Sequence, residues 1–332
     1  GFHQTILVYL LCLTHYEVKF LLKFINGFNH TNTKLKPKYE YAPRYTMLNQ
    51  LTRKEWISKS STANPKGLRA KAVFGIPAVE INQIYSPICE KILSVKESRT
   101  SNKKELKSPL ILGVTGSVAI GKTTLSNILK EILEKAPYDF ETVIVSTDNF
   151  LFPNRVLEER QNLHRKGFPE SFRYKEILQF LKSIKKRDVI SIPTYSHETY
   201  DITEKMKTIR SPEILILEGI NILQDPPPSI NQIEPQTIRD FIDFSIYLDA
   251  EEPIVKQWYI ERFLSYCNNA RYDSTSFFTQ FKDFTEKQAS ELAKSIWESI
   301  NSPNLKMHIG PSITHADLVL FKEHDHTISR IN

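Results

Sequence analysis

The sequence predicts an α/β fold in which a mostly parallel, doubly wound sheet follows a helical N-terminal portion. Two observations predict it: short apolar runs rich in β-branched residues, and helical patterns that separate them. The runs lie at residues 110–114, 142–145, 214–217, 244–248 and 318–321. Strands of a parallel sheet are buried on both faces, so continuous apolar runs are expected there. Each run is therefore predicted to form one strand of a single sheet.

The helices are clearest at two places between these strands. Residues 123–133 continue directly from a loop that contains glycines. Residues 285–300 carry apolar side chains at three- and four-residue spacing, namely Ala289, Leu292, Ala293, Ile296, Trp297 and Ile300. Such a stripe is typical of a helix that packs one face on the core. A polar, lysine-rich stretch at 98–108 predicts a solvated connection into the first strand.

Composition limits the class of protein. The chain has 332 residues and a formal charge of +6, a modest excess that suits anionic ligands and does not call for a nucleic-acid partner. Its cysteines, Cys12, Cys89 and Cys267, have neither disulfide-framework nor metal-ligand spacing, so a reducing, cytoplasmic location is expected. The apolar run at 5–13 is too short to span a bilayer, and no membrane partner is expected.

The loop after the first predicted strand carries the strongest motif. Residues 116–123 match G-x-x-x-x-G-K-[ST] between a strand and a helix, which is the context that a P-loop requires and which gives the fold a P-loop NTPase type. Its amides point at phosphate oxygens, Lys122 reaches the β- and γ-phosphates of ATP, and Thr123 can bind Mg²⁺. The alternative is a glycine turn before an ordinary helix. The expected nucleotide contacts are Gly116, Ser117, Val118, Ala119, Ile120, Gly121, Lys122, Thr123 and Thr124.

Acidic residues follow three of the predicted strands. Ligands of open α/β sheets bind outside the carboxyl ends of the strands, so Asp148 and Glu218 are candidates there. Either could accept a proton from a substrate hydroxyl or hold the metal ion through water. The alternatives are a turn or cap residue for Asp148 and a structural acid for Glu218. Asp249 precedes an acidic helix start and is interpreted mainly as a helix cap.

A helix after the fourth strand carries a cationic candidate. Tyr259, Arg262 and Tyr266 are spaced i, i+3 and i+7 and therefore share one helix face. Arg262 could clamp a transferring phosphoryl group from that face. The alternative is a surface arginine between half-buried aromatic side chains.

Six stretches together resemble one family, the bacterial type I pantothenate kinases. They are residues 116–122, 166–171, 193–197, 214–224, 243–249 and 258–263. Residues 51–56 and 80–87 are similar to the helical N-terminal portion of that family. The resemblance implies a kinase-like domain over 45–332, with a helical lead-in at 45–108 and a kinase core at 109–332. Residues 1–44 are then an extension of unknown role.

The resemblance also implies an activity and a set of site residues. The activity is phosphorylation of the 4′-hydroxyl of pantothenate by ATP, the first step of coenzyme A biosynthesis, in a homodimer that coenzyme A inhibits. By position, Asp148 is the base toward that hydroxyl, Lys122 and Thr123 are the phosphate and Mg²⁺ contacts, and Arg262 lies near the transferred phosphate. The implied pocket residues are Tyr195, His197, Tyr259, Arg262 and Asn301, with His197 and Tyr266 near coenzyme A.

The sequence departs from the family at two places. Asn127 stands where some members carry an arginine that contacts coenzyme A, and residues 308–315 replace a Pro-Thr-Arg stretch that brings a second basic residue. Two other hypotheses stay open: a related P-loop kinase that acts on a nucleoside or a sugar phosphate, and a regulator that binds nucleotide without catalysis. A nucleic-acid-binding protein is suggested by charge alone.

Overall fold

The computed structural model describes residues 50–61, 76–99, 108–135, 137–227, 236–272 and 275–332. The predicted extension at 1–44 lies outside these residues. Within them the chain forms a seven-stranded sheet in the order β1-β9-β8-β7-β2-β6-β3. The strands are β1 (Leu51–Thr52), β2 (Leu110–Gly116), β3 (Thr142–Ser146), β6 (Ile214–Glu218), β7 (Phe244–Asp249), β8 (Leu318–Lys322) and β9 (Ile328–Ile331).

The five apolar runs form the parallel part of this sheet, as predicted. β3, β6, β2, β7 and β8 pair side by side in parallel, and every residue of β2 and β6 is buried. Two short strands escaped prediction: β9 pairs antiparallel with β8, and β1 pairs antiparallel with β9. The lead-in before the core therefore contributes an edge strand beside the last strand of the chain.

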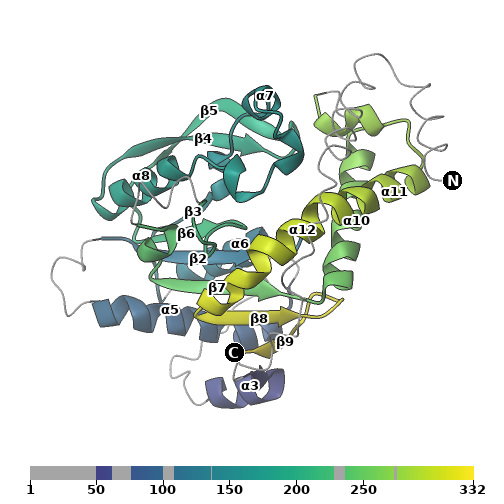
Figure 1. The fold of residues 1–332 in the computed structure, drawn as a ribbon. Coiled ribbons are helices and arrows are strands. Elements are labelled where there is room, and N and C mark those ends of the chain that lie inside the picture. Colours follow the sequence, from purple (N-terminus) through teal and green to yellow (C-terminus); the bar gives the residue numbers. More distant parts are fainter. Residues whose placement is uncertain (1–49, 62–75, 100–107, 136, 228–235, 273–274) are drawn as a thin grey trace.

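The helices cover both faces of the sheet. They are α3 (Arg53–Ser61), α4 (Ala78–Glu80), α5 (Ser86–Ser98), α6 (Lys122–Leu133), α7 (Asn154–Glu159), α8 (Tyr174–Lys185), α10 (Glu252–Asn269), α11 (Glu286–Ile296) and α12 (Ser302–Asn304). In Figure 1, α6 lies behind the sheet while the yellow stretch from α11 to α12 crosses in front of it. None of the helices within the described ranges is long and apolar enough to cross a membrane.

The helix predicted at 285–300 begins and continues as expected, with one change. A capping box starts it, because Thr285 Oγ1 accepts from Gln288 N (3.3 Å) and Gln288 Oε1 accepts from Thr285 N (2.7 Å). Past Ile296 the chain continues through π-helical turns at Trp297–Asn301 and Leu305–Ile309, with α12 between them. Such turns are frequent at functional sites because they rotate side chains out of the regular helical register.

One structural unit was not predicted at all, a hairpin outside the central sheet. β4 (Ile190–Ser196) pairs antiparallel with β5 (Asp201–Ile209), with a register shift between Pro193 and Thr194. Both strands mix polar and apolar residues, and hydroxyl pairs such as Thr194 and Thr203 (Oγ1 to Oγ1, 2.6 Å) link them. The hairpin matters because its turn carries His197 and Tyr200.

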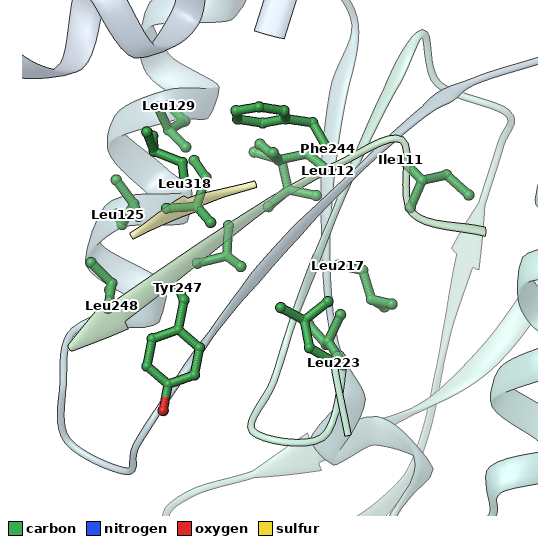
Figure 2. Packing of buried hydrophobic residues seen from close by; sticks show 14 of the residues in the cluster. Ile111, Leu112, Leu125, Leu129, Leu217, Leu223, Phe244, Tyr247, Leu248 and Leu318 are labelled. Carbon is green, nitrogen blue, oxygen red and sulfur yellow. The ribbon is translucent and has the colours of Figure 1, made fainter. Parts of the chain in front are cut away.

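The core joins α6 to the sheet. Figure 2 shows Leu125 and Leu129 of α6 beside Leu112 and Leu318 of the strands, and all four side chains are at most 3% exposed. Burial of a leucine side chain contributes about 1.5–3 kcal/mol. The strand before the phosphate loop and the helix after it are therefore both fixed by packing, and the loop between them starts and ends at rigid points.

Candidate active site

The loop from β2 to α6 has the backbone geometry of a phosphate cradle. Gly116 has φ +137° and Gly121, the N-cap of α6, has φ +99°, so the loop enters and leaves through conformations that favour glycine. Ala119 also has a positive φ of 60°. The first residues of α6, whose amides have no partner within a helix, line the larger cavity, so the helix dipole favours an anion there.

Gly116 cannot tolerate a side chain. A Cβ there would lie 2.4 Å from the backbone oxygen of Leu248, whereas a Cβ at Gly167, which has φ +92°, would meet nothing closer than 3.7 Å. We expect Gly116→Ala to lower the free energy of unfolding by about 3 kcal/mol. Gly167→Ala, which also has a positive φ but meets no collision, should lose only about 1 kcal/mol. Urea unfolding of both variants checks this, and equal losses would contradict it.

Lys122 lies at the centre of this loop. Its ammonium donates to the backbone oxygens of Gly116 (3.2 Å) and Ser117 (2.7 Å). Burial lowers the pKa of Lys122 to about 8, against the attraction of Asp148 and Glu218. A cation that is partly removed from water interacts more strongly with phosphate oxygens than a fully hydrated one.

Glu218 and Thr123 form an oxygen-rich point beside the loop. Glu218 ends β6 and pairs in register with Val114 of β2 and Ser146 of β3, so it lies at the carboxyl edge of the sheet. Thr123 Oγ1 donates to Glu218 Oε1 (3.0 Å), while the buried Oε2 has no hydrogen-bond partner among the described residues. Burial raises the pKa of Glu218 and the charge of Lys122 opposes this.

This donor set fits Mg²⁺. Mg²⁺ prefers oxygen ligands, keeps several waters and usually takes one or two protein ligands together with substrate phosphates. The unpartnered Glu218 oxygen and the Thr123 hydroxyl offer two such atoms. In the part of the chain that the structure describes, no group of three or more His, Cys, Asp or Glu side chains could hold a metal ion by itself.

Asp148 follows β3 at the same edge. It belongs to a short 3₁₀ turn, Thr147–Phe150, and its backbone N–H donates to Ser146 Oγ (3.2 Å). The residue therefore serves as a turn residue in its backbone. Its side chain lines a cavity of about 690 Å³ that Lys122, Thr123 and Glu218 also line. A turn residue and a catalytic acid are compatible interpretations of Asp148, because its backbone forms the turn while its carboxylate stays available to a ligand.

A second cavity of about 150 Å³ adjoins the first, and its inner wall is aromatic. Phe263, Phe277, Phe278 and Phe281 line it, together with Tyr259 from α10. Seven residues line both cavities, which therefore adjoin: Val118, Lys166, His197, Tyr200, Arg262, Tyr266 and Asn301. The structure thus brings an apolar chamber directly against the phosphate loop.

The predicted pocket residues meet around this space. Tyr195 lines the larger cavity and Tyr259 the smaller, while His197, Arg262 and Asn301 line both. The Tyr195 and His197 rings touch edge to face with centroids 5.1 Å apart. Of the nine predicted nucleotide contacts, Gly116, Ser117 and Ile120 do not line the larger cavity. The other six do: Val118, Ala119, Gly121, Lys122, Thr123 and Thr124. Ser117 and Ile120 are buried and can serve the cradle only through their backbone.

Tyr259, Arg262 and Tyr266 share one face of α10, as the spacing predicted. Burial raises the pKa of the Tyr259 hydroxyl, while its hydrogen bond with Asn301 and the charge of Arg262 lower it, so that hydroxyl stays protonated. One prediction about this helix was wrong. Asp249 is the buried last residue of β7 and the N-cap of α10 is Glu251, because the chain needs two more residues to turn from strand into helix.

Sequence reasoning missed Lys166, which lies between the two cavities. It is 9% exposed, and its ammonium donates to Asn154 Oδ1 (2.7 Å) and to the backbone oxygen of Tyr200. The ammonium also lies 4.0 Å from the centroid of the Tyr200 ring. Burial lowers the pKa of Lys166 to about 8, against the attraction of Asp201 and Asp148. The stretch 166–171 is part of the family resemblance, and this was the one feature of the sequence that could have pointed to Lys166.

Sequence reasoning also missed a cluster at the far side of the larger cavity. Lys322 of β8 donates to the backbone oxygen of Ile120 (2.8 Å) and lies 5.0 Å from the centroid of the Trp258 ring. His326 stacks on the same ring at 4.3 Å, and both residues line the cavity. The strand β9, which follows the turn that carries His326, contains no apolar run that would have predicted it.

Comparison with known proteins agrees with this architecture. The phosphoribulokinase / uridine kinase family matches residues 111–267. The pantothenate kinase of Shewanella baltica (strain OS185) is 37% identical over 286 residues, 83% of this chain and 89% of that protein. The pantothenate kinase of Parvibaculum lavamentivorans is 43% identical over 261 residues, 75% of this chain and 80% of that protein.

Solved structures of low identity share the fold. The D-glycerate 3-kinase of Cryptococcus neoformans superposes with a TM-score of 0.53 at 16% identity, over 73% of this chain and 96% of that one. The family match at residues 111–267 extends well beyond the phosphate loop. The chain therefore belongs to the pantothenate kinase family of P-loop kinases.

Proposed function

We propose that this chain transfers the γ-phosphoryl group of ATP to the 4′-hydroxyl of pantothenate. The observation that carries the proposal is that two cavities adjoin and share seven lining residues, one against the phosphate loop and one lined by aromatic rings. A kinase needs a donor site and an acceptor site that meet at one point. Asp148 and Arg262 both line the part of this space where the two substrates would meet.

In the proposed reaction the substrate hydroxyl oxygen attacks the γ-phosphorus, the bond to the β–γ bridging oxygen breaks, and ADP leaves. Asp148 accepts the hydroxyl proton. Lys122 and the loop amides hold the β- and γ-phosphates, and Arg262 faces the phosphoryl group as its charge moves. When bound, Mg²⁺ neutralises charge on those phosphates, and the Thr123 hydroxyl and the Glu218 carboxylate would hold it.

The acceptor end suits pantothenate in particular. This acid joins two hydroxyls, an amide and a carboxylate along one flexible chain. Lys166 provides positive charge and Asn301 a polar amide to the substrate, and both line the two cavities. The aromatic wall accepts the apolar methylene groups.

The function is tested by supplying the purified protein with radiolabelled ATP and either pantothenate or uridine. We expect labelled product with pantothenate and none with uridine. Label in uridine alone would identify a related kinase of the uridine kinase type. Label in neither, with ATP still bound, would leave a nucleotide-binding protein without transfer activity.

Further properties come from the family resemblance and are part of the proposal. Residues 45–332 form the kinase domain, which acts as a cytoplasmic homodimer inhibited by coenzyme A. Coenzyme A contains the pantothenate moiety and phosphates, so it would compete for both of the adjoining cavities. His197 and Tyr266, which line both cavities, are the proposed contacts.

Asn127 sets the expected strength of that inhibition. Its Nδ2 donates to the backbone oxygen of Thr123 (2.8 Å), and it offers no charge to a phosphate. We expect Asn127→Arg to tighten inhibition by coenzyme A roughly tenfold, since a charge-assisted bond to phosphate is worth about 1.4 kcal/mol. Asn127→Leu is the uncharged control and should leave the inhibition constant unchanged. Equal inhibition of the arginine variant and the native enzyme would contradict the expectation.

A further inference from the structure

The segment from Asn301 to Ile309 faces the active site with two asparagines. Asn301 and Asn304 are three residues apart and both line the larger cavity. π-helical turns flank the short helix α12 on both sides. Asn301 has a proposed role in substrate binding, whereas Asn304 has none so far. It is 4% exposed, so it is a buried polar residue whose presence needs an explanation.

Asn304 is tied to the turn that carries Lys166. Its Nδ2 donates to the backbone oxygen of Gly167 (2.9 Å), and this acceptor fixes which end of the amide points at the turn. His308, one turn further along, touches the Phe168 ring edge to face at 5.7 Å. Residues 166–168 are therefore held by two side chains of one helical segment. Gly167 has φ +92°, so its carbonyl is presented from an unusual backbone conformation.

The same turn sets the position of the Lys166 ammonium. Within the turn, Gly167 N donates to Ser171 Oγ (2.9 Å), which stiffens it. From this base the Lys166 side chain reaches Asn154 Oδ1 and the ring of Tyr200 on the hairpin side. The ammonium is thereby placed where the two cavities join. Any shift of the turn relative to Asn301 changes the distance between two groups that face the same substrate.

We propose that Asn304 is a positioning residue for the acceptor substrate: by holding the Gly167 carbonyl it keeps the Lys166 ammonium and the Asn301 amide in one fixed arrangement. The inference rests on the proposed acceptor site. Stability alone does not account for this residue, because Asn304 Oδ1 is buried with no hydrogen-bond partner among the described residues. A half-satisfied buried amide stabilises a fold less than an apolar side chain of similar size.

Kinetics of Asn304→Ala test the proposal first. Loss of one positioning hydrogen bond should raise the KM for pantothenate roughly fivefold, with the KM for ATP and the thermal midpoint little changed. Asn304→Asp keeps the side-chain shape without the donor hydrogens and should raise the KM as well. The matched control is Ser302→Ala, which removes a bond from the same segment to Glu252 Oε1 (2.6 Å) and should leave the KM unchanged.

A double-mutant cycle with Lys166→Met separates positioning from general damage. If Asn304 acts through Lys166, Asn304→Ala adds no further rise in KM once Lys166 is replaced. Additive effects, or an unchanged KM in Asn304→Ala and Asn304→Asp, would overturn the proposal.

A readout without substrate keeps the inference independent of the proposed function. Acetic anhydride labelling followed by mass spectrometry measures how readily the Lys166 amine reacts. We expect slow labelling in the native enzyme and at least severalfold faster labelling in Asn304→Ala, because the released turn exposes the amine. Equal rates would overturn the positioning role. An enzyme that labels as expected and does not phosphorylate pantothenate would instead overturn the proposed function alone.

Discussion

Asp148→Asn is expected to lower kcat for pantothenate roughly 10³-fold, the usual size of a lost general base, while ATP still binds. The amide keeps the shape of the carboxylate and its place in the turn after β3, and it cannot accept a proton. Removing the negative charge also removes an attraction that supports the protonated forms of Lys122 and Lys166. Kinetics at pH 6.5 keep both lysines charged, so that the loss reports the base.

Two controls make the Asp148 result specific. Asp139→Asn changes an exposed aspartate with φ 54°, a conformation that asparagine also adopts readily, and should leave kcat unchanged. Glu218→Gln should raise the Mg²⁺ concentration needed for half-maximal rate, and excess Mg²⁺ should restore much of the activity. Unchanged turnover in Asp148→Asn would rule Asp148 out as the base. If Glu218→Gln lost more kcat than Asp148→Asn, and excess Mg²⁺ did not restore it, the role of base would pass to Glu218.

Lys122→Met is expected to lower kcat/KM for ATP by roughly 10²–10³-fold, the usual effect of removing one preorganised donor at the developing charge. The variant should fold as well as the native enzyme. Burial disfavours the ammonium, so methionine in the same space leaves the thermal midpoint unchanged or raises it. Lys135→Met is the control, because Lys135 is exposed and forms a surface ion pair with Glu131 one helical turn away. An equal loss in both variants would contradict the assignment.

The pKa of Lys122 gives this account a pH dependence. The lysine is charged below about pH 8 and loses its proton above it, so kcat/KM for ATP should fall above about pH 8. Lys322, which also lines the cavity, has its pKa lowered by burial to about 8 and adds to the fall. A profile that stays flat to pH 9.5 would contradict a role for these ammonium groups in binding the free nucleotide.

The parallel sheet and its phosphate loop followed from the sequence because their signals are local. A strand buried on both faces is expected to read as a nearly continuous apolar run, and residues 110–114 of β2 and 214–217 of β6 do so. The loop needs glycine at two positions with positive φ, and Gly116 and Gly121 mark them. The hairpin β4–β5 gives no such continuous apolar signal. Polar cross-strand pairs and a hydrogen bond from Lys207 to the Ile144 carbonyl (3.0 Å) help to hold it instead.

Site residues could be predicted where their type and position in the sequence indicate a role, and could not where the role depends on burial in the folded chain. Asp148 and Glu218 follow strands, so the edge rule for α/β sheets found them. Lys166 sits in an ordinary polar stretch, and only the tertiary structure buries its ammonium between Asn154 and Tyr200. For Asp249 the local pattern predicted a helix cap, but α10 starts two residues later and its N-cap is Glu251.

The central claim is that the acceptor is the 4′-hydroxyl of pantothenate, held beside Asp148. Phosphorus NMR of the product formed from ATP and pantothenate tests it directly. The account predicts one new phosphate ester whose phosphorus couples to the methylene protons at C4′, formed together with ADP. Phosphate on another hydroxyl, or hydrolysis of ATP without a new ester, would contradict it.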